Sequence, residues 1–366
     1  MTSRQRFVNT LTGRPVDRVP FIKVFGGTNA IRPEWERDQP GLSRDIDRRL
    51  QFEGVYRGWG TTPVNFWMTR RGEPEVLQED ARQVIRRYAD GTVERLQKGQ
   101  DYHHQYLEWP VKTRADWDRV RQRHLDPHDP ERFPANWGQL VREYRGRDYP
   151  LQLTHGGVYG FARNLMGDEA LLYAFYDDPD LVRSIMSGYT DMVLELWTTM
   201  VAQVQFDLVE FWEDMASKNG SLISPTLFRQ FMAPQYERVV AFARAHGIEI
   251  ILVDSDGYTD DLAADLVAAG VTALYPFEVG AGCDPAAVRR RFPDLGIIGG
   301  LAKECMIDGR DSIDRELTRV RSLLGLGRCI PGPDHFVLSN VSWDSYRYFM
   351  EQLRQLILTP PVSSGG

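Results

Sequence analysis

Residues Ile248 to Tyr275 read IEIILVDSDGYTDDLAADLVAAGVTALY. They begin with a continuous apolar run, Ile250 to Val253, which is short and β-branched, as in a strand buried on both faces. A helical pattern follows, and its apolar stripe consists of Leu262, Leu266 and Ala269. Gly270 is placed to end this helix, and a second apolar run, Val271 to Tyr275, comes after it. The stretch therefore predicts a β-α-β unit.

Carboxylates stand directly after both of these strands. Asp254 and Asp256 follow the first strand, and Glu278 follows the second. In parallel α/β proteins the carboxyl ends of the strands are where ligands bind and chemistry takes place. Asp254 and Asp256 are two residues apart at a strand end, so we expect both side chains on the same side. A functional site is expected around these three residues.

Strand-like runs followed by helical patterns recur along the rest of the chain. The further strands are expected at 18–24, 150–154, 207–211 and 296–298, with a last one reaching residue 330. Long helices are expected over 180–203, 225–246, 312–324 and 342–358. Regular alternation of this kind, without hairpins in the second half of the chain, is typical of a (β/α)8 TIM barrel.

Residues 64–107 interrupt this alternation with short β segments. The last two flank Asp90-Gly91, which is a two-residue hairpin signal. We interpret the region as a β-hairpin insertion on the barrel. The chain is thus expected to form a single α/β domain over residues 1–358, and 359–366 a disordered tail.

Composition excludes several classes of protein. The 366 residues carry 44 basic and 51 acidic side chains, so the net charge of -7 gives no sign of a nucleic-acid surface. A membrane span is excluded because no run of about twenty apolar residues exists. The start of the chain has no apolar signal segment, and the three cysteines are far apart, so we expect reduced thiols in a cytoplasmic protein.

The ends of the predicted strands present a set of polar side chains that would face one mouth of a barrel. They are His155, Glu210, Glu213, Asp214, Asp254, Asp256, Glu278, Asp334 and His335. Such a cluster either binds a cation through oxygen and imidazole ligands or raises one carboxyl pKa to make a general acid. Acids at these positions also commonly cap the following helices, and this alternative stays open for each one.

Several motifs resemble those of the uroporphyrinogen decarboxylase superfamily, over nearly the whole chain. They are Arg6 to Pro20, Lys218 to Pro225, Asp254 to Gly257, Pro276 to Glu278, Gly299 to Leu301 and Ile330 to His335. This superfamily also contains corrinoid-linked methyltransferases that act on methylcobalamin and a thiol or folate acceptor. The resemblance implies a TIM barrel but does not by itself select an activity.

The chain departs from authentic uroporphyrinogen decarboxylases where those enzymes hold the substrate carboxylates. They resemble one another in an arginine pair before a Pro-Glu-Tyr segment, whereas Gly26 and Ala30 occupy the matching positions here. A polycarboxylate porphyrinogen would lose its bidentate partners, with only Arg32 nearby. His335 matches the histidine near the C-terminal end of the family.

The chain also departs from the zinc-dependent methyltransferases. Asp254-Ser-Asp256 stands in place of their His-x-Cys pair, and Pro333 in place of a further cysteine. The segment Gly299-Gly-Leu-Ala302-Lys303 also lacks, at Ala302, the acid of the superfamily pattern Gly-Gly-Ile-Asp-Lys. The thiolate-rich zinc site is therefore not expected. An oxygen-rich site for zinc or another divalent metal, formed by Asp254, Asp256, Glu278 and His335, is the alternative, as is metal-free acid/base chemistry.

The leading functional hypothesis is an enzyme that moves a methyl group between a corrinoid-bound or small methylated substrate and an acceptor. Asp254, Asp256 and His335 would bind and polarise the acceptor, with Glu210 as a further catalytic candidate. The expected substrate-binding residues are His155, Glu213, Lys218, Glu278, Asp334 and Arg163. Lys218 and Arg163 are also well explained as ordinary surface or helix-face residues.

Two alternatives remain at this point. The first is a decarboxylase of a smaller or less anionic substrate, in which Asp254, Asp256 or His335 would protonate the carbanion. The second is a non-catalytic binder of a corrinoid or tetrapyrrole. Since no corrinoid-binding domain is fused to the chain, a corrinoid would come from a separate protein. The expected partners are otherwise a small-molecule substrate and, as an open option, a second copy in a homodimer.

Overall fold

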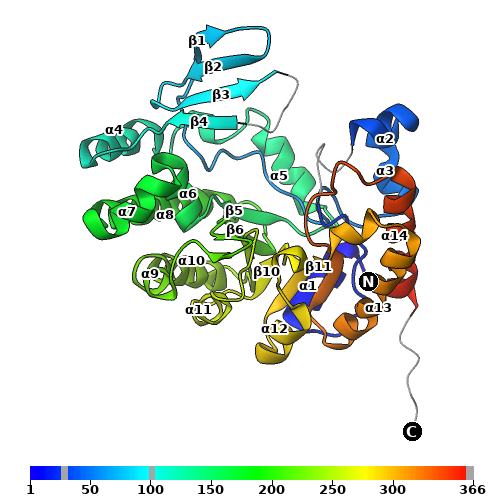
Figure 1. Cartoon of the computed structure of the whole chain (residues 1–366). Helices are drawn as coiled ribbons and strands as arrows, with labels where there is room; N and C mark the ends of the chain where they lie inside the picture. The colour runs from blue at the N-terminus through cyan, green and yellow to red at the C-terminus, as the bar shows by residue number, and fades with distance from the viewer. Residues whose placement is uncertain (26–31, 99–103, 360–366) are drawn as a thin grey trace.

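The computed structural model describes residues 1–25, 32–98 and 104–359. Two sheets organise it, a parallel sheet wrapped by helices and an antiparallel sheet β1–β4 that stands apart from it at the top of Figure 1. The strands are β1 (Glu75–Glu79), β2 (Gln83–Arg87), β3 (Val93–Gln97), β4 (His104–Glu108), β5 (Gln152–His155), β6 (Leu208–Trp212), β7 (Ala216–Ser217), β8 (Gly220–Ser221), β9 (Ile250–Asp254), β10 (Ala273–Tyr275), β11 (Gly296–Leu301) and β12 (Cys329–Pro333). The helices are α1 (Ser3–Thr12), α2 (Pro33–Asp38), α3 (Leu42–Leu50), α4 (Arg114–His124), α5 (Trp137–Arg145), α6 (Val158–Met166), α7 (Asp168–Asp177), α8 (Pro179–Val201), α9 (Pro225–Leu227), α10 (Ala233–Ala245), α11 (Ala263–Ala268), α12 (Pro285–Arg291), α13 (Arg310–Gly325) and α14 (Trp343–Leu358).

The parallel sheet has six strands in the order β12-β11-β10-β9-β6-β5. Next to β5, a single parallel bridge joins Gly60 to Leu151. The fold is therefore α/β with a parallel sheet, as the alternating pattern predicts. Closure into an eight-stranded barrel stays a prediction, because the hydrogen-bonded ladder includes six strands among the described residues.

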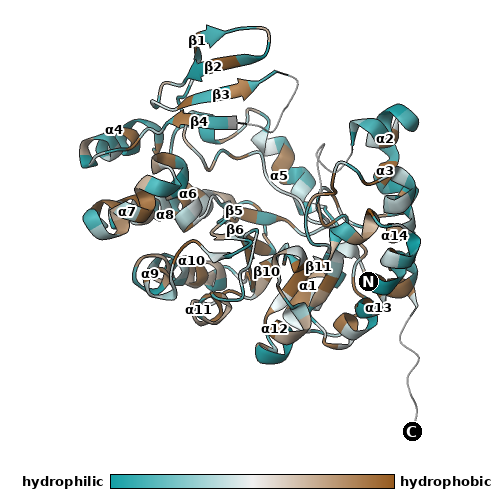
Figure 2. Cartoon of the chain, viewed as in Figure 1, coloured by the Kyte–Doolittle hydropathy of each residue, from teal (hydrophilic) through white to brown (hydrophobic). Residues whose placement is uncertain are grey.

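Both faces of the parallel sheet are buried, which explains its continuous apolar runs. On the outer face, residues such as Val209, Ile251 and Val253 pack against the helices. On the inner face, Leu208, Ile250 and their neighbours pack in a separate cluster. Figure 2 shows apolar residues concentrated on the parallel strands and on α1, whereas α2 at the periphery is largely hydrophilic.

Helix α1 covers the inner face at the starts of the strands. Phe7 and Leu11 of this helix are buried among inner-face residues of four strands, which are Leu208, Ile250, Ile298 and Ile330. The capping box of Thr2 and Gln5 fixes the first turn of the helix. This end of the sheet is closed by apolar side chains, so polar chemistry is left to the opposite end.

Local sequence accounts for several helix starts. Thr113 forms a capping box at the start of α4, and Asp284 caps α12 ahead of Pro285. Ser224 caps the predicted helix 225–246, but the helix is divided by a π-helical turn, Phe228–Met232, between α9 and α10. Gly270, with φ 95°, ends the helix of the central β-α-β unit as expected.

The predicted first strand, 18–24, is wrong in the part of the chain that the structure describes. Pro20 has no N–H to donate to a ladder. The N–H of Phe21 donates to the Glu53 carboxylate (3.0 Å), and the Phe21 carbonyl accepts from the backbone N–H of Glu53 (2.8 Å). The backbone N–H and carbonyl of Phe21 thus bond to residue 53 instead of a neighbouring strand, although Phe21, Ile22 and Val24 are buried.

The predicted β insertion is larger than a hairpin. The turn at Asp90-Gly91 joins β2 to β3, as expected, and β1 and β4 extend the sheet to four antiparallel strands. The predicted tail lies outside the described residues except for Thr359. None of the helices that the structure describes combines the length and the apolar composition needed to cross a membrane.

We expect Phe7→Ala to lower the free energy of unfolding by about 3–5 kcal/mol, because it opens a cavity between α1 and the sheet. Urea denaturation followed by circular dichroism measures this. Val8→Ala on the half-buried face of the same helix is the matched control, with an expected cost of about 1 kcal/mol. Equal costs for the two variants would contradict the role of α1 as the inner closure.

Candidate functional site

The polar end of the parallel sheet lies at the carboxyl ends of β6, β9 and β10. Trp212 pairs with Asp254 in the register of β6 and β9, and Asp254 pairs with Tyr275 in that of β9 and β10. Residues paired across parallel strands project from the same face. Tyr275 belongs to the inner cluster, so Trp212 and Asp254 also face inward, as does Glu210 two residues earlier.

Arg57 joins two of these inward-facing carboxylates. Its Nη1 donates to Glu210 Oε1 and to Asp254 Oδ2, both at 3.1 Å. The guanidinium carbon lies 5.3 Å from the centre of the Tyr275 ring and 5.4 Å from that of Tyr56. Two carboxylates therefore share one delocalised cation that also contacts aromatic rings.

Glu210 is held from a second side by a chain of hydrogen bonds. The side-chain amide of Gln152, on β5, donates to Glu210, and the indole N–H of Trp59 donates to the Gln152 carbonyl oxygen at 2.5 Å. Both residues are buried. This network compensates part of the cost of burying a carboxylate.

Asp214, Asp254 and Asp256 form the centre of the site. One carboxylate oxygen of each lies within 4.8 Å of those of the other two. Burial, followed by the charge of Glu210, raises the pKa of Asp254 well above its usual range, although Arg57 acts in the opposite direction. Burial and the charge of Asp256 also raise the pKa of Asp214. Asp254 and Asp214 therefore hold protons more tightly than isolated carboxylates do.

Asp256 pairs with His335, whose Nε2 lies 3.1 Å from Asp256 Oδ2. Burial disfavours the charged imidazolium, but the hydrogen bond and the charge of Asp256, together with the charge of Glu278, outweigh it. The pKa of His335 is consequently raised above its usual value of 6.5. The structure thus brings together Asp254, Asp256, His335 and Glu210, which are the four residues predicted to be catalytic.

Glu278 and Asp334 form an adjoining network around Lys303. Lys303 Nζ lies 3.2 Å from Glu278 Oε1 and 3.7 Å from Asp334 Oδ1. The other oxygen of Glu278 accepts from the N–H of Gly257 at 2.7 Å, and Asp334 accepts from the N–H groups of Gly280 and Lys303. These contacts hold the loop after Asp256 next to the loop of His335.

The comparisons with known proteins agree with this architecture. Residues 99–356 match the model of the uroporphyrinogen decarboxylase (URO-D) family. The chain belongs to this family. A methyltransferase from Methanosarcina mazei has a similar fold, with a TM-score of 0.62 and 16% identity over 98% of this chain and 100% of that one. A proposed vitamin-B12-independent methionine synthase from Listeria monocytogenes aligns over 59% of this chain and 69% of its own, with a TM-score of 0.34 and 13% identity. No curated protein matched the chain.

Two predicted substrate-binding residues lie away from the carboxylate group. His155 points to the outer face of β5, where it contacts the rings of Tyr189 and Phe211, and burial lowers its pKa to about 3. Its strand places Gln152 and Thr154 inward, so His155 is necessarily outward. Glu213 caps α6 by accepting from the N–H groups of residues 158, 159 and 160 and from the Tyr236 hydroxyl at 2.8 to 3.0 Å.

The remaining two predicted substrate-binding residues differ in their positions. Arg163 lies at the edge of the carboxylate group, where its Nη1 donates to the Asp214 carbonyl at 2.8 Å and its Nη2 lies 3.5 Å from the Asp214 carboxylate. Asp214 has φ 44°, and this left-handed conformation turns its side chain and carbonyl toward that arginine. Lys218 is exposed in the turn between β7 and β8.

The donor set does not fit the zinc site of the related methyltransferases. Cys283, Cys305 and Cys329 are buried, and burial raises the pKa of each thiol to about 12. The four predicted metal ligands, Asp254, Asp256, Glu278 and His335, also do not form one free set. Both Glu278 oxygens already accept hydrogen bonds, one from Gly257 and one from Lys303. The trio Asp214, Asp254 and Asp256 offers oxygen ligands suited to a hard cation, but Arg57 and Arg163 already supply positive charge there.

Arg57 is the functional residue that sequence reasoning missed. It lies in an irregular segment between α3 and β1, and no local pattern singles it out. Lys303, in the segment Gly299-Gly-Leu-Ala302-Lys303, was also not among the predicted site residues. Gly299 in this segment has φ 100°, and a Cβ there would lie 2.0 Å from the Pro276 carbonyl oxygen. The glycine at 299 therefore admits a neighbouring backbone.

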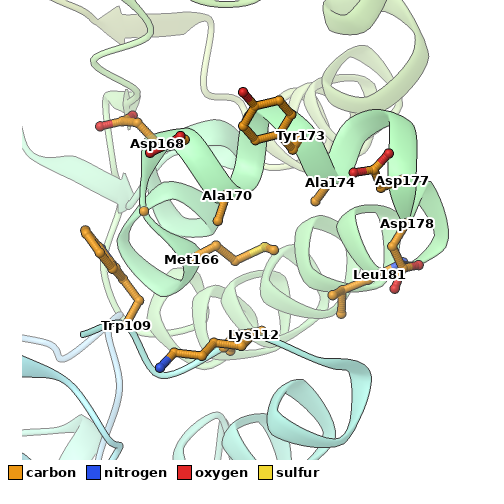
Figure 3. Close-up of a pocket in the computed structure, with 13 residues that line it drawn as sticks. Trp109, Lys112, Met166, Asp168, Ala170, Tyr173, Ala174, Asp177, Asp178 and Leu181 are labelled. Atoms are coloured by element: carbon orange, nitrogen blue, oxygen red, sulfur yellow. Dashed lines mark hydrogen bonds between the residues drawn. The ribbon is translucent and has the colours of Figure 1, made fainter. Parts of the chain in front are cut away.

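A cavity of about 620 Å³ lies elsewhere, between the segment after β4 and helices α6, α7 and α8. Figure 3 shows Trp109 and Lys112 on one side of it, with Met166, Tyr173 and Asp177 on the other. Its lining includes none of the carboxylates described above. It is therefore a separate feature of the molecule and not the mouth of the sheet.

Asp256→Asn should lower the pKa of His335, because it removes the charge and weakens the hydrogen bond that favour the imidazolium. Histidine ring resonances of labelled protein, titrated by NMR, measure the change. Asp344→Asn, an exposed acid at the start of α14, is the control and should leave the titration of His335 unaltered. An unchanged pKa in Asp256→Asn would contradict the pairing.

Proposed function

We propose that this member of the uroporphyrinogen decarboxylase family transfers a methyl group between a small methylated substrate and an acceptor. The observation that carries the proposal is the trio of Asp214, Asp254 and Asp256 at the carboxyl end of the parallel sheet, with oxygens within 4.8 Å. Similarity of fold to a methyltransferase from Methanosarcina mazei is consistent with this class of reaction.

We also propose that the parallel sheet closes into the eight-stranded barrel expected for this family.

The charge of the site favours methyl transfer over decarboxylation of a polycarboxylate. Glu210, Asp254 and Asp214 already engage Arg57 and Arg163, the two arginines of the site. A substrate with several carboxylates would meet further carboxylates at close range, and like charges repel strongly in a partly buried site. A neutral or cationic substrate avoids this penalty.

In the proposed reaction Asp254 holds or transfers the proton of the substrate heteroatom. A methyl group leaves an oxygen, nitrogen or sulfur atom more readily when that atom gains a proton, and an acceptor gains a methyl group more readily when it loses one. A carboxyl group with a raised pKa serves in both directions. Arg57 fixes one oxygen of Asp254, and the other oxygen is the one that would face the substrate.

Asp256 and His335 would bind the polar part of the substrate. The Asp256 side chain is 44% exposed and that of His335 is 25% exposed, so a ligand can reach both. Glu278, Lys303 and Asp334 would position this pair through the two loops that they join. A divalent metal, if bound by the carboxylate trio, would polarise the substrate. We further propose a corrinoid on a separate protein as the methyl acceptor or donor.

Asp254→Asn should reduce the rate of methyl transfer by a factor of about 10² to 10⁴, because it removes the proton-transferring group. The assay combines the protein with methyl ethers, methylamines and methyl thioethers, with a reduced corrinoid as acceptor, and quantifies the methylated corrinoid by chromatography. Thermal unfolding of the variant verifies that the fold is retained.

Asp180→Asn is the matched control, since this acid forms only an exposed pair with Arg183 within one helix. Its rate should stay within about twofold of the wild type, as expected for a surface change. Release of labelled carbon dioxide from a carboxylated substrate, without any methylated product, would contradict methyl transfer and support the decarboxylase alternative. Binding of a corrinoid without turnover of any substrate would support the non-catalytic alternative.

A further inference from the structure

We infer that the small substrate is a protonated methylamine. Its nitrogen carries a positive charge and a proton, which Asp254 would hold while the methyl group leaves to the acceptor and the nitrogen leaves as a neutral amine that keeps the proton. The inference rests on the proposed methyl transfer and names the chemical class of its substrate. It comes from a second feature of the site, which is that aromatic rings stand beside the carboxylates. Carboxylates combined with aromatic faces are the chemistry that recognises alkylammonium ions.

Trp212 provides the first of these rings. It ends β6 and projects from the same face as Asp254, its partner in the register. Glu210, two residues earlier, points inward and is buried, whereas Trp212 is 42% exposed. Trp212 is therefore a large aromatic side chain that ends an inward-facing series and is open to solvent. It is placed to contact a ligand that enters this end of the sheet.

A second wall of rings lies beside His335. The ring of Phe25 lies 5.2 Å from that of His335, 4.7 Å from that of Phe336 and 5.2 Å from that of Tyr275. Phe25 and Phe336 are each half-buried. Because His335 contacts Asp256, these rings lie next to a carboxylate that is open to solvent.

Arg57 shows that this environment accepts a delocalised organic cation. Its guanidinium lies near the rings of Tyr56 and Tyr275 and binds the carboxylates of Glu210 and Asp254. Toward solvent, Asp256 contacts His335, whose ring lies 5.2 Å from that of Phe25. A carboxylate and aromatic rings thus also occur together on the open side of the site, where Trp212 projects from the same face as Asp254.

The charges of the site do not exclude a further cation. Four carboxylates, those of Glu210, Asp214, Asp254 and Asp256, face two arginines. His335 adds a positive charge only when it is protonated, so the group is negative or nearly neutral before a ligand binds. An alkylammonium ion offsets the remaining negative charge, and its methyl groups contact the rings with little loss of hydration.

The test is calorimetric titration of the whole protein with choline, tetramethylammonium and 3,3-dimethylbutan-1-ol. The last compound has the shape of choline but no charge. Choline or tetramethylammonium should bind at least about tenfold more tightly than the neutral compound, because only the cations gain the charge and ring interactions. Equal binding of choline and its neutral counterpart, or no binding of either cation at tens of millimolar, would overturn the inference.

Variants locate the binding. Trp212→Leu and Asp256→Asn should each weaken choline binding severalfold, and Trp212→Phe should restore much of it because a ring is kept. Tyr173→Leu is the control, since Tyr173 is an exposed aromatic residue of the separate cavity beside α7. Loss of binding in Tyr173→Leu with retention in Trp212→Leu would place the cation in that cavity and overturn the assignment.

Metal ions are tested in the same way. Magnesium, manganese and zinc are titrated alone, and then choline is titrated in their presence. A metal that binds tightly and excludes choline in the wild type, but not in Asp214→Asn, would overturn the inference in favour of a metal site. Cation binding without any methyl transfer would refute the proposed function and, with it, the role of the cation as substrate, whereas transfer from neutral ethers alone would overturn the inference and leave the proposed function intact.

Discussion

The shared contact of one guanidinium with two buried carboxylates constrains the whole polar end of this sheet. Glu210 and Asp254 point inward from adjacent strands, and without a cation between them their burial would be strongly unfavourable. Arg57 supplies the positive charge, while Trp59 and Gln152 hold Glu210 from the other side. The segment that carries Arg57 must therefore lie across the strand ends, which determines the entrance to the site.

The two ends of the parallel sheet differ for the same reason. At the starts of the strands, α1 brings Phe7 and Leu11 into the inner cluster, so that end is apolar and closed. At the other end, Glu210 follows Leu208 in the inward-facing series of β6, and Asp254 follows Ile250 and Leu252 in that of β9. Placing charge there keeps the hydrophobic core continuous while a set of titratable groups remains in reach of solvent.

The residues at this end of the sheet differ from those that the resemblance to zinc-dependent methyltransferases implies. Where related methyltransferases carry soft zinc ligands, this chain carries Asp254, Asp256 and a proline at 333. Carboxylates with raised pKa values, an imidazole and aromatic rings stand there instead. Such a set holds protons and organic cations, and this is the basis for proposing acid-assisted methyl transfer with a cationic substrate.

Local sequence determined much of this protein. The apolar runs, the caps of Thr113, Ser224 and Asp284, and the carboxylates after β9 and β10 depend on residues close in the chain, so a single sequence indicates them. Tertiary structure decided the rest. His155 ends β5 and Glu210 lies in the middle of β6, and one faces outward and the other inward because side chains alternate along a strand. Arg57 reaches carboxylates more than 150 residues away, and segment 18–24 bonds to Glu53 instead of a strand. These outcomes depend on register and on contacts between distant segments, which no local pattern encodes.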